Sequence, residues 1–273
     1  MKRRLIQLCA ALLYNLNLKG FAEASIYKGK SKGLCVPGLN CYSCPGAVGS
    51  CPLGTLQNAL SAMDRKLPFY ILGVLLLFGV TICGFLCPFG LVQELLYKIP
   101  VPKIKKNRVT QELSKVKYVI LAVFVIILPV VFKAASGLPV PAFCKYICPA
   151  GTLEGGIPLV LLDDSLSGLA GALFHWKVLV LAVILVSACF LYRSFCRILC
   201  PLGAIYSLFA PVALLGVRID RDTCVDCGRC VRTCKMDVRQ VGDRECIQCG
   251  ECMKECNVDA IYWKKPWDVK SKK

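Results

Sequence analysis

Two cysteine runs near the C-terminal end of the chain have the spacing of ligands to iron–sulfur clusters. Each run is C-x2-C-x2-C-x3-C, and the second repeats the spacing of the first. In the bacterial two-cluster pattern, the first three cysteines of a run bind one cluster and the fourth binds the other. The spacing predicts two 4Fe–4S sites, one formed by Cys224, Cys227, Cys230 and Cys256 and one formed by Cys246, Cys249, Cys252 and Cys234. Two zinc sites held by the same thiolates are the alternative.

Four copies of a Cys-Pro-x-Gly element are spread over the rest of the chain. They begin at Cys51, Cys87, Cys148 and Cys200, and the last three follow a cysteine four residues earlier, at Cys83, Cys144 and Cys196. Proline lacks an N–H and is preset for the first position of a helix, so each cysteine is predicted to cap a helix. The positive end of that helix would face an anionic thiolate cluster. We expect two such helices near the membrane surface, Leu91–Ile99 and Ile205–Val217.

These cysteine elements belong to an internal duplication. Residues 51–57 resemble residues 148–154, and residues 83–88 resemble residues 196–201. Each half then has the order span, outer cysteine loop, span, inner cysteine pair. One 4Fe–4S cluster is predicted between the inner pairs, which are Cys83, Cys87, Cys196 and Cys200. Buried thiols that bind nothing are the alternative for this set.

The outer cysteines outnumber the four ligands that a cluster needs. An outer cluster is predicted to use four of five cysteines, which are Cys41, Cys44, Cys51, Cys144 and Cys148. The repeat supports both Cys44 and Cys51 as the partner of Cys148, so that choice stays open. Disulfides are the alternative here, because the outer compartment is oxidising. Cys9 and Cys189 lie alone within apolar segments and are interpreted as packing residues.

The elements that must position these thiols are membrane helices. The chain is 56% hydrophobic and carries a formal charge of +17. A membrane protein combines these two properties naturally, because basic residues gather in its cytoplasmic loops. About 20 apolar residues cross a bilayer, which predicts four spans at about residues 5–20, 67–87, 118–138 and 174–193. The predicted fold is a membrane α-helical domain in two pseudo-symmetric halves, residues 1–217, followed by a small α+β two-cluster ferredoxin domain, residues 218–273.

The first segment has a second interpretation. Basic residues precede its apolar stretch, and Ala22–Glu23–Ala24 could be the cleavage site of a signal peptide. We favour an uncleaved span, because its polar residues could face a helix bundle. The positive-inside rule places the basic loop 88–117 and the C-terminal domain in the cytoplasm. Segment 20–66 then lies outside, although it is itself basic.

Several functional classes are excluded by what the chain contains. Its single histidine, His175, argues against bis-histidine haem, and no GxGxxG or GxxxxGK[ST] motif is present. The basic residues lie between apolar runs rather than on an amphipathic face, which argues against nucleic-acid binding. The predicted spans contain no Asp or Glu, which argues against a proton pump.

The order of these motifs resembles the NapH-like membrane ferredoxins over nearly the whole chain. The resemblance rests on Cys41-Tyr-Ser-Cys-Pro45, the four Cys-Pro-x-Gly elements and the double C-terminal run. Similar Cys-x3-Cys-Pro pairs occur in NosR-type and CcoG-type proteins. The resemblance to the NapH-like proteins implies a multi-pass subunit of the cytoplasmic membrane. Such a subunit moves electrons between a cytoplasmic donor or the quinone pool and a periplasmic reductase or flavoprotein.

From the residues we therefore expect an electron-transfer subunit rather than a stand-alone enzyme, with two to four 4Fe–4S clusters and no catalytic residue. The rival is a copper-binding or copper-reducing assembly factor, because Cu(I) prefers soft thiolates. The absence of Met-rich or His-rich tracts counts against this rival.

Overall fold

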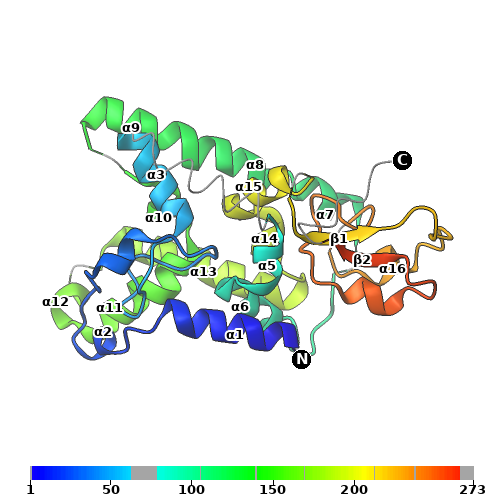
Figure 1. Ribbon diagram of the computed structural model, residues 1–273. Coiled ribbons are helices and arrows are strands. Elements are labelled where there is room, and N and C mark those ends of the chain that lie inside the picture. The colour runs from blue at the N-terminus through cyan, green and yellow to red at the C-terminus, as the bar shows by residue number, and fades with distance from the viewer. Residues whose placement is uncertain are drawn as a thin grey trace.

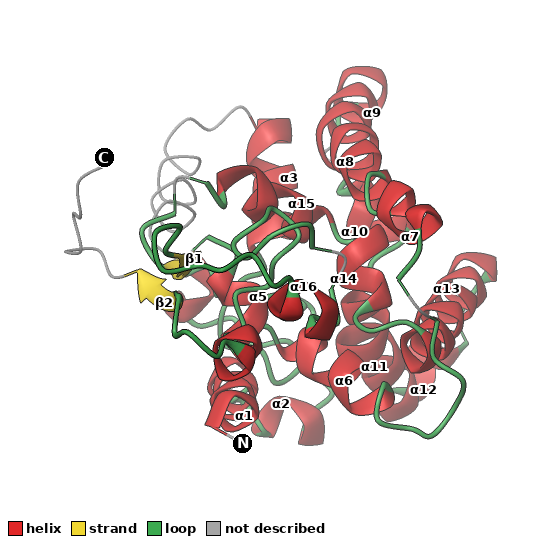
Figure 2. Cartoon of the chain, turned by 90° about the vertical axis from the view of Figure 1, so that its right-hand side faces the viewer, coloured by secondary structure: helices red, strands yellow, loops and turns green. Residues whose placement is uncertain are grey.

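The computed structural model describes residues 2–62, 79–104, 106–138, 140–168, 170–211, 213–236 and 238–264. The described chain is mostly helical, with one two-stranded sheet at its C-terminal end (Figures 1 and 2). The predicted span 67–87 lies outside the described residues except for its last part, from Gly79 onward. The first half contains α1 (Lys2–Tyr14), α2 (Lys19–Ala22), η1 (Lys30–Gly33), α3 (Pro52–Ala62), α5 (Thr81–Phe85) and α6 (Pro88–Leu96).

The second half contains the longer helices. One continuous helix, Arg108–Ser136, is built from α7 (Arg108–Leu113), α8 (Val116–Ile120), η2 (Leu121–Ile127) and α9 (Leu128–Ser136). It is followed by α10 (Ala142–Tyr146), η3 (Gly151–Gly156), α11 (Ile157–Leu162), α12 (Asp164–Ser167), α13 (Ala172–Phe190), α14 (Ser194–Ile198) and α15 (Pro201–Phe209).

Two of these helices are long and apolar enough to cross a membrane. Among the described residues, Arg108–Ser136 and α13 meet this condition by length and composition, and they overlap the predicted spans 118–138 and 174–193. The first begins earlier than predicted because Asn107 and Thr110 form a capping box ahead of the apolar run. Its π-helical segment η2 precedes Pro129, and η3 likewise precedes Pro158. Proline removes an N–H from the helical ladder, and a wider turn accommodates the break.

The first predicted span is shorter than expected. Helix α1 ends at Tyr14 rather than near Gly20, and its 13 residues reach about 20 Å at ~1.5 Å per residue. The asparagines that follow bind backbone and loop groups instead. Asn15 donates to the carbonyl of Ala11 and to Asn40, and Asn17 donates to the carbonyl of Pro45. Helix α1 packs against α5 and α6.

The helices that follow the cysteine elements begin at the proline, as predicted. Helices α3, α6 and α15 start at Pro52, Pro88 and Pro201, and the capping residues Cys87 and Cys200 have extended backbones. The ranges expected for two of these helices, Leu91–Ile99 and Ile205–Val217, were wrong at both ends, since both ranges begin after the proline. Helix α6 stops at Leu96 and α15 at Phe209, because the chain turns there towards the loop after α6 and towards the C-terminal sheet.

The C-terminal segment encloses both cysteine runs between two strands. Strands β1 (Gly216–Ile219) and β2 (Ile261–Lys264) pair antiparallel, with Gly216 opposite Lys264 and Ile219 opposite Ile261. Short helices α16 (Arg229–Thr233) and η4 (Glu251–Glu255) lie between them in sequence and contact each other. In Figure 1 this segment lies at one end of the molecule, and α2, α11 and α12 lie at the other.

Candidate metal centres

Four cavities in the described chain are each lined by four cysteines. Two lie in the helical part and two in the C-terminal segment. The four sets are Cys41, Cys51, Cys144 and Cys148; Cys83, Cys87, Cys196 and Cys200; Cys234, Cys246, Cys249 and Cys252; and Cys224, Cys227, Cys230 and Cys256. We call their cavities outer, inner, proximal and distal, in that order. The structure thus brings together the same inner and C-terminal sets that the spacing predicts.

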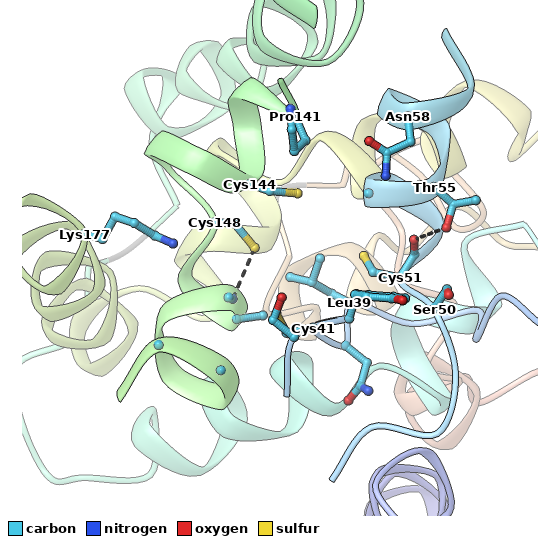
Figure 3. Close-up of a pocket in the computed structure, with 18 of the residues that line it drawn as sticks. Leu39, Cys41, Ser50, Cys51, Thr55, Asn58, Pro141, Cys144, Cys148 and Lys177 are labelled. Atoms are coloured by element: carbon cyan, nitrogen blue, oxygen red, sulfur yellow. Dashed lines mark hydrogen bonds between the residues drawn. The ribbon is translucent and has the colours of Figure 1, made fainter. Parts of the chain in front are cut away.

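The repeat left Cys44 and Cys51 as alternative partners of Cys148, and one of the two lines the outer cavity. It has a volume of about 690 Å³, and Figure 3 shows Cys41, Cys51, Cys144 and Cys148 around it. Cys44 is not among its lining residues. It is buried instead beside α1, where its Sγ lies 3.5 Å from Oδ1 of Asn15. The structure therefore brings Cys51, rather than Cys44, next to Cys148.

Burial keeps the outer thiols protonated when they bind nothing. It raises the pKa of both Cys41 and Cys51 to about 12, with neighbouring negative charge adding to the effect. A metal ligand must be the thiolate, so occupation of this site releases protons. The backbone N–H of Cys41 donates to Oε2 of Glu154 at 2.7 Å, which ties the loop to η3.

Helix N-termini face thiols as the proline pattern predicts. The backbone N–H of Gly203 in α15 donates to Sγ of Cys200 at 3.3 Å. In the outer cavity the N–H of Gly151 donates to Sγ of Cys148 at 3.4 Å. Both donors lie three residues after the cysteine, so these two Cys-Pro-x-Gly elements carry their own N–H donor to sulfur. These contacts would stabilise the ionised sulfur.

A buried charge cluster beside the inner cavity was not anticipated from the sequence. Arg193 is fully buried, and its Nη1 donates to the carbonyl of Cys83 at 2.5 Å. Its Nε and Nη2 donate to Oε1 of Glu94 at 3.0 and 2.6 Å. Arg3 of α1 donates to both oxygens of the same carboxylate at 2.7 and 2.8 Å. Burial would raise the pKa of Glu94, but the two arginines outweigh it and lower the pKa to about 2.

The sequence signal for this cluster was weak. The positive-inside count treats Glu94 as one charge in a basic loop, and Arg193 stands at the end of a predicted span. Arg193 has a left-handed backbone, with φ of +51°, and this conformation turns its side chain inward. No sequence pattern predicts that turn.

The two C-terminal cavities have matching loops. In each run the residue two after the first cysteine is left-handed, at Asp226 and Gln248, and so is the glycine after the second cysteine, at Gly228 and Gly250. The repeated turns curl each run around its cavity. The proximal cavity is small, about 30 Å³, whereas the distal cavity is about 460 Å³ and includes the exposed Cys227.

The state and grouping of the thiols bear on the disulfide, zinc and copper alternatives. All twenty cysteines lie in the described part of the chain, and each is a free thiol there. Within the described residues, no three His, Cys, Asp or Glu side chains converge as ligands of a single ion. Four thiols around one cavity are the donor set that binds a 4Fe–4S cubane.

A comparison with known proteins identifies the family. The model of a 4Fe–4S binding domain family matches residues 50–70, 68–107, 118–157 and 172–219. Each segment contains one Cys-Pro-x-Gly element, and together they cover more than half of the chain. The chain belongs to this 4Fe–4S family. Its cofactors are 4Fe–4S clusters.

Relatives of this 4Fe–4S protein include three curated proteins. The uncharacterized protein MJ0750 of Methanocaldococcus jannaschii is 30% identical over 67% of this chain and 70% of its own length. YccM of Escherichia coli is 24% identical over 64% of this chain and 46% of its own length. The ferredoxin-type protein MauN of Paracoccus denitrificans is 26% identical over 69% of this chain and 62% of its own length. No solved structure matches the chain.

Proposed function

We propose that the chain is a NapH-like electron-transfer subunit of the cytoplasmic membrane whose four cysteine sets each hold one 4Fe–4S cluster. The observation that carries this proposal is the series of four cavities with four cysteines each. When bound, such clusters supply outer-sphere transfer of single electrons over a wide range of potentials.

Neighbouring cavities share lining residues, which supports a continuous path. Met236 and Ile247 line both the inner and the proximal cavity. Leu39 lines both the inner and the outer cavity. Cys252 of the proximal set lies close enough to Cys230 of the distal set for their charges to interact. The shared lining residues and this charge contact support a path from the distal cavity to the outer one.

The names of two relatives support the same function. YccM is assigned provisionally to electron transport, and MauN is called a ferredoxin-type protein of methylamine utilization. This chain spans about half to two thirds of the lengths of YccM and MauN, so the partners of those two proteins are not assigned to it.

The direction of the two apolar helices supports a transmembrane arrangement. Figure 1 shows Arg108–Ser136 running from α7, near the C-terminal strands, to α9, which packs against α3. We place the C-terminal domain, 218–273, in the cytoplasm, where the exposed Cys227 would meet a donor, and the outer cavity towards a periplasmic reductase or flavoprotein. The quinone pool is the other partner that the resemblance implies.

Anaerobic purification with iron and sulfide analysis and EPR tests the proposal. About sixteen irons per chain are expected, four for each site. About eight irons would restrict the clusters to the C-terminal domain. Cys148→Ser should lose about four irons. Copper bound by the wild type and lost in this variant, with iron unchanged, would support the copper-handling rival instead.

A further inference from the structure

Each Cys-Pro-x-Gly element carries a polar side chain six residues after its cysteine. These positions hold Gln57, Gln93, Glu154 and Tyr206. An oxygen of each side chain hydrogen-bonds the backbone of another cysteine segment. Oε1 of Gln57 accepts from the N–H of Phe143 at 3.1 Å, and Oε1 of Gln93 accepts from Phe195 at 3.0 Å. The Glu154 carboxylate accepts from Cys41, and the Tyr206 hydroxyl donates to Pro37. An oxygen is therefore sufficient to anchor the neighbouring segment.

The two glutamines make a second contact that the other two residues do not make. Nε2 of Gln57 donates to Sγ of Cys144 at 3.4 Å, in the outer set. Nε2 of Gln93 donates to Sγ of Cys196 at 3.1 Å, in the inner set. Each amide nitrogen also donates to the carbonyl four residues earlier in its own helix, at 3.3 Å. The same three contacts thus occur in both cavities.

The orientation of both amides follows from their partners. A backbone N–H can only donate, so the amide oxygen must face Phe143 or Phe195 and the NH2 group must face the sulfur. Both glutamines are fully buried, so water does not compete for these contacts. A carboxylate would anchor the backbone equally well, as at Glu154. The sulfur contact and the contact with the carbonyl four residues earlier both use the NH2 group, which a carboxylate lacks.

We propose that Gln57 and Gln93 are positioning residues that raise the reduction potentials of the outer and inner clusters by donating a hydrogen bond to one thiolate of each. Reduction adds negative charge to the cluster and its sulfurs, and a fixed N–H donor stabilises that charge. This inference rests on the proposed function, because it requires clusters in both cavities.

Paired substitutions test it, and each variant is the control for the other. Methionine has similar length and no N–H donor, so Gln93→Met should lower the midpoint potential of the inner cluster alone. Gln57→Met should lower that of the outer cluster alone. The measurement is an anaerobic EPR redox titration of the full chain in nanodiscs, with iron counted in every sample. An exchangeable-proton hyperfine coupling should also disappear from the affected cluster.

The variants Gln57→Glu and Gln93→Glu keep the backbone anchor and cover the case in which methionine disturbs the site. They should retain iron and still lower the corresponding potential. Unchanged potentials in iron-replete variants would overturn the inference, as would loss of iron from both glutamate variants. A wild-type chain with only about eight irons would instead remove the proposed function, so the two failures are distinguishable.

Discussion

At the scale of single residues, the outer cavity separates two cysteines that lie in one short motif. Cys41 lines the cavity, whereas Cys44 turns away towards Asn15, the residue after α1. Both thiols are close to the same carboxylate, Glu154, and both have raised pKa values because of burial. The difference between them is their direction, which depends on the turn at residues 41–47 and on the position of α1.

This difference predicts opposite results for two neighbouring substitutions. Cys41→Ser should lose about four irons per chain, because serine is a poor ligand for a cluster that needs four thiolates. Cys44→Ser should keep the full iron content. Iron and sulfide analysis under anaerobic conditions checks both variants. Loss of iron from Cys44→Ser with retention in Cys41→Ser would show that the outer ligand set is wrong.

At the scale of elements, one carboxylate joins three helical segments. Glu94 lies on α6, Arg3 on α1, and Arg193 in the turn between α13 and α14. The side chains of Glu94 and Arg193 are 1% and 0% exposed. Removing one member of such a buried set leaves an uncompensated charge, which costs about 3–5 kcal/mol.

Glu94→Gln should therefore lower the free energy of unfolding by about 3–5 kcal/mol near neutral pH. The native pKa of Glu94 is about 2, below the ordinary value of about 4.3. Its contribution is complete above about pH 4.3 and is lost as the pH falls towards about 2, so the variant and the wild type should converge in that window. Denaturant unfolding in micelles measures this difference. Glu112→Gln, in an exposed pair with Lys115, should change little.

A second ion pair ties the C-terminal segment to the long helix. Nζ of Lys117 lies 2.7 Å from both oxygens of Glu245, and the Lys117 side chain is 3% exposed. Lys117→Met should weaken this docking by about 1.5–3 kcal/mol, the usual value of a hydrogen bond to a charged group. Limited proteolysis should then cleave the 210–222 region at least about tenfold faster. Lys115→Met is the matched control, and equal cleavage of the two variants would contradict the prediction.

The sequence predicted those parts of the site that depend on local spacing. The C-terminal sets and the inner set follow from C-x2-C and C-x3-C intervals, and the proline after each cysteine predicted where α3, α6 and α15 begin. The structure brings these sets together, and their ligation of clusters remains a prediction. The choice between Cys44 and Cys51, the inward turn of Arg193 and the sulfur contacts of Gln57 and Gln93 depend on segments far apart in the chain. No local interval carries that information.

At the scale of the whole molecule, the four cavities follow one another from the C-terminal segment to the opposite end. The inner cavity is the only one of the four that shares lining residues with both the outer and the proximal cavity. Removing the inner site should therefore divide the path into two parts. Each part would keep its own ligands.

Cys196→Ser tests this division. It should lose about four irons and leave the outer EPR signal unreduced when an impermeant reductant is added on the side of the C-terminal domain in proteoliposomes. The proximal and distal signals should still appear within the mixing time. Reduction of the outer site at the wild-type rate would show that electrons bypass the inner cavity.

The C-terminal segment forms part of the wall of the inner cavity, and this has a consequence for cluster insertion. Met236, Arg244, Glu245 and Ile247 of the C-terminal segment line this cavity of about 30 Å³. A Cβ on Gly84 would lie 2.3 Å from the carbonyl oxygen of Ile247, so the segment seats directly on the loop that carries Cys83. We therefore expect the inner site to be filled before the C-terminal segment docks, so that docking closes the site over a finished cofactor.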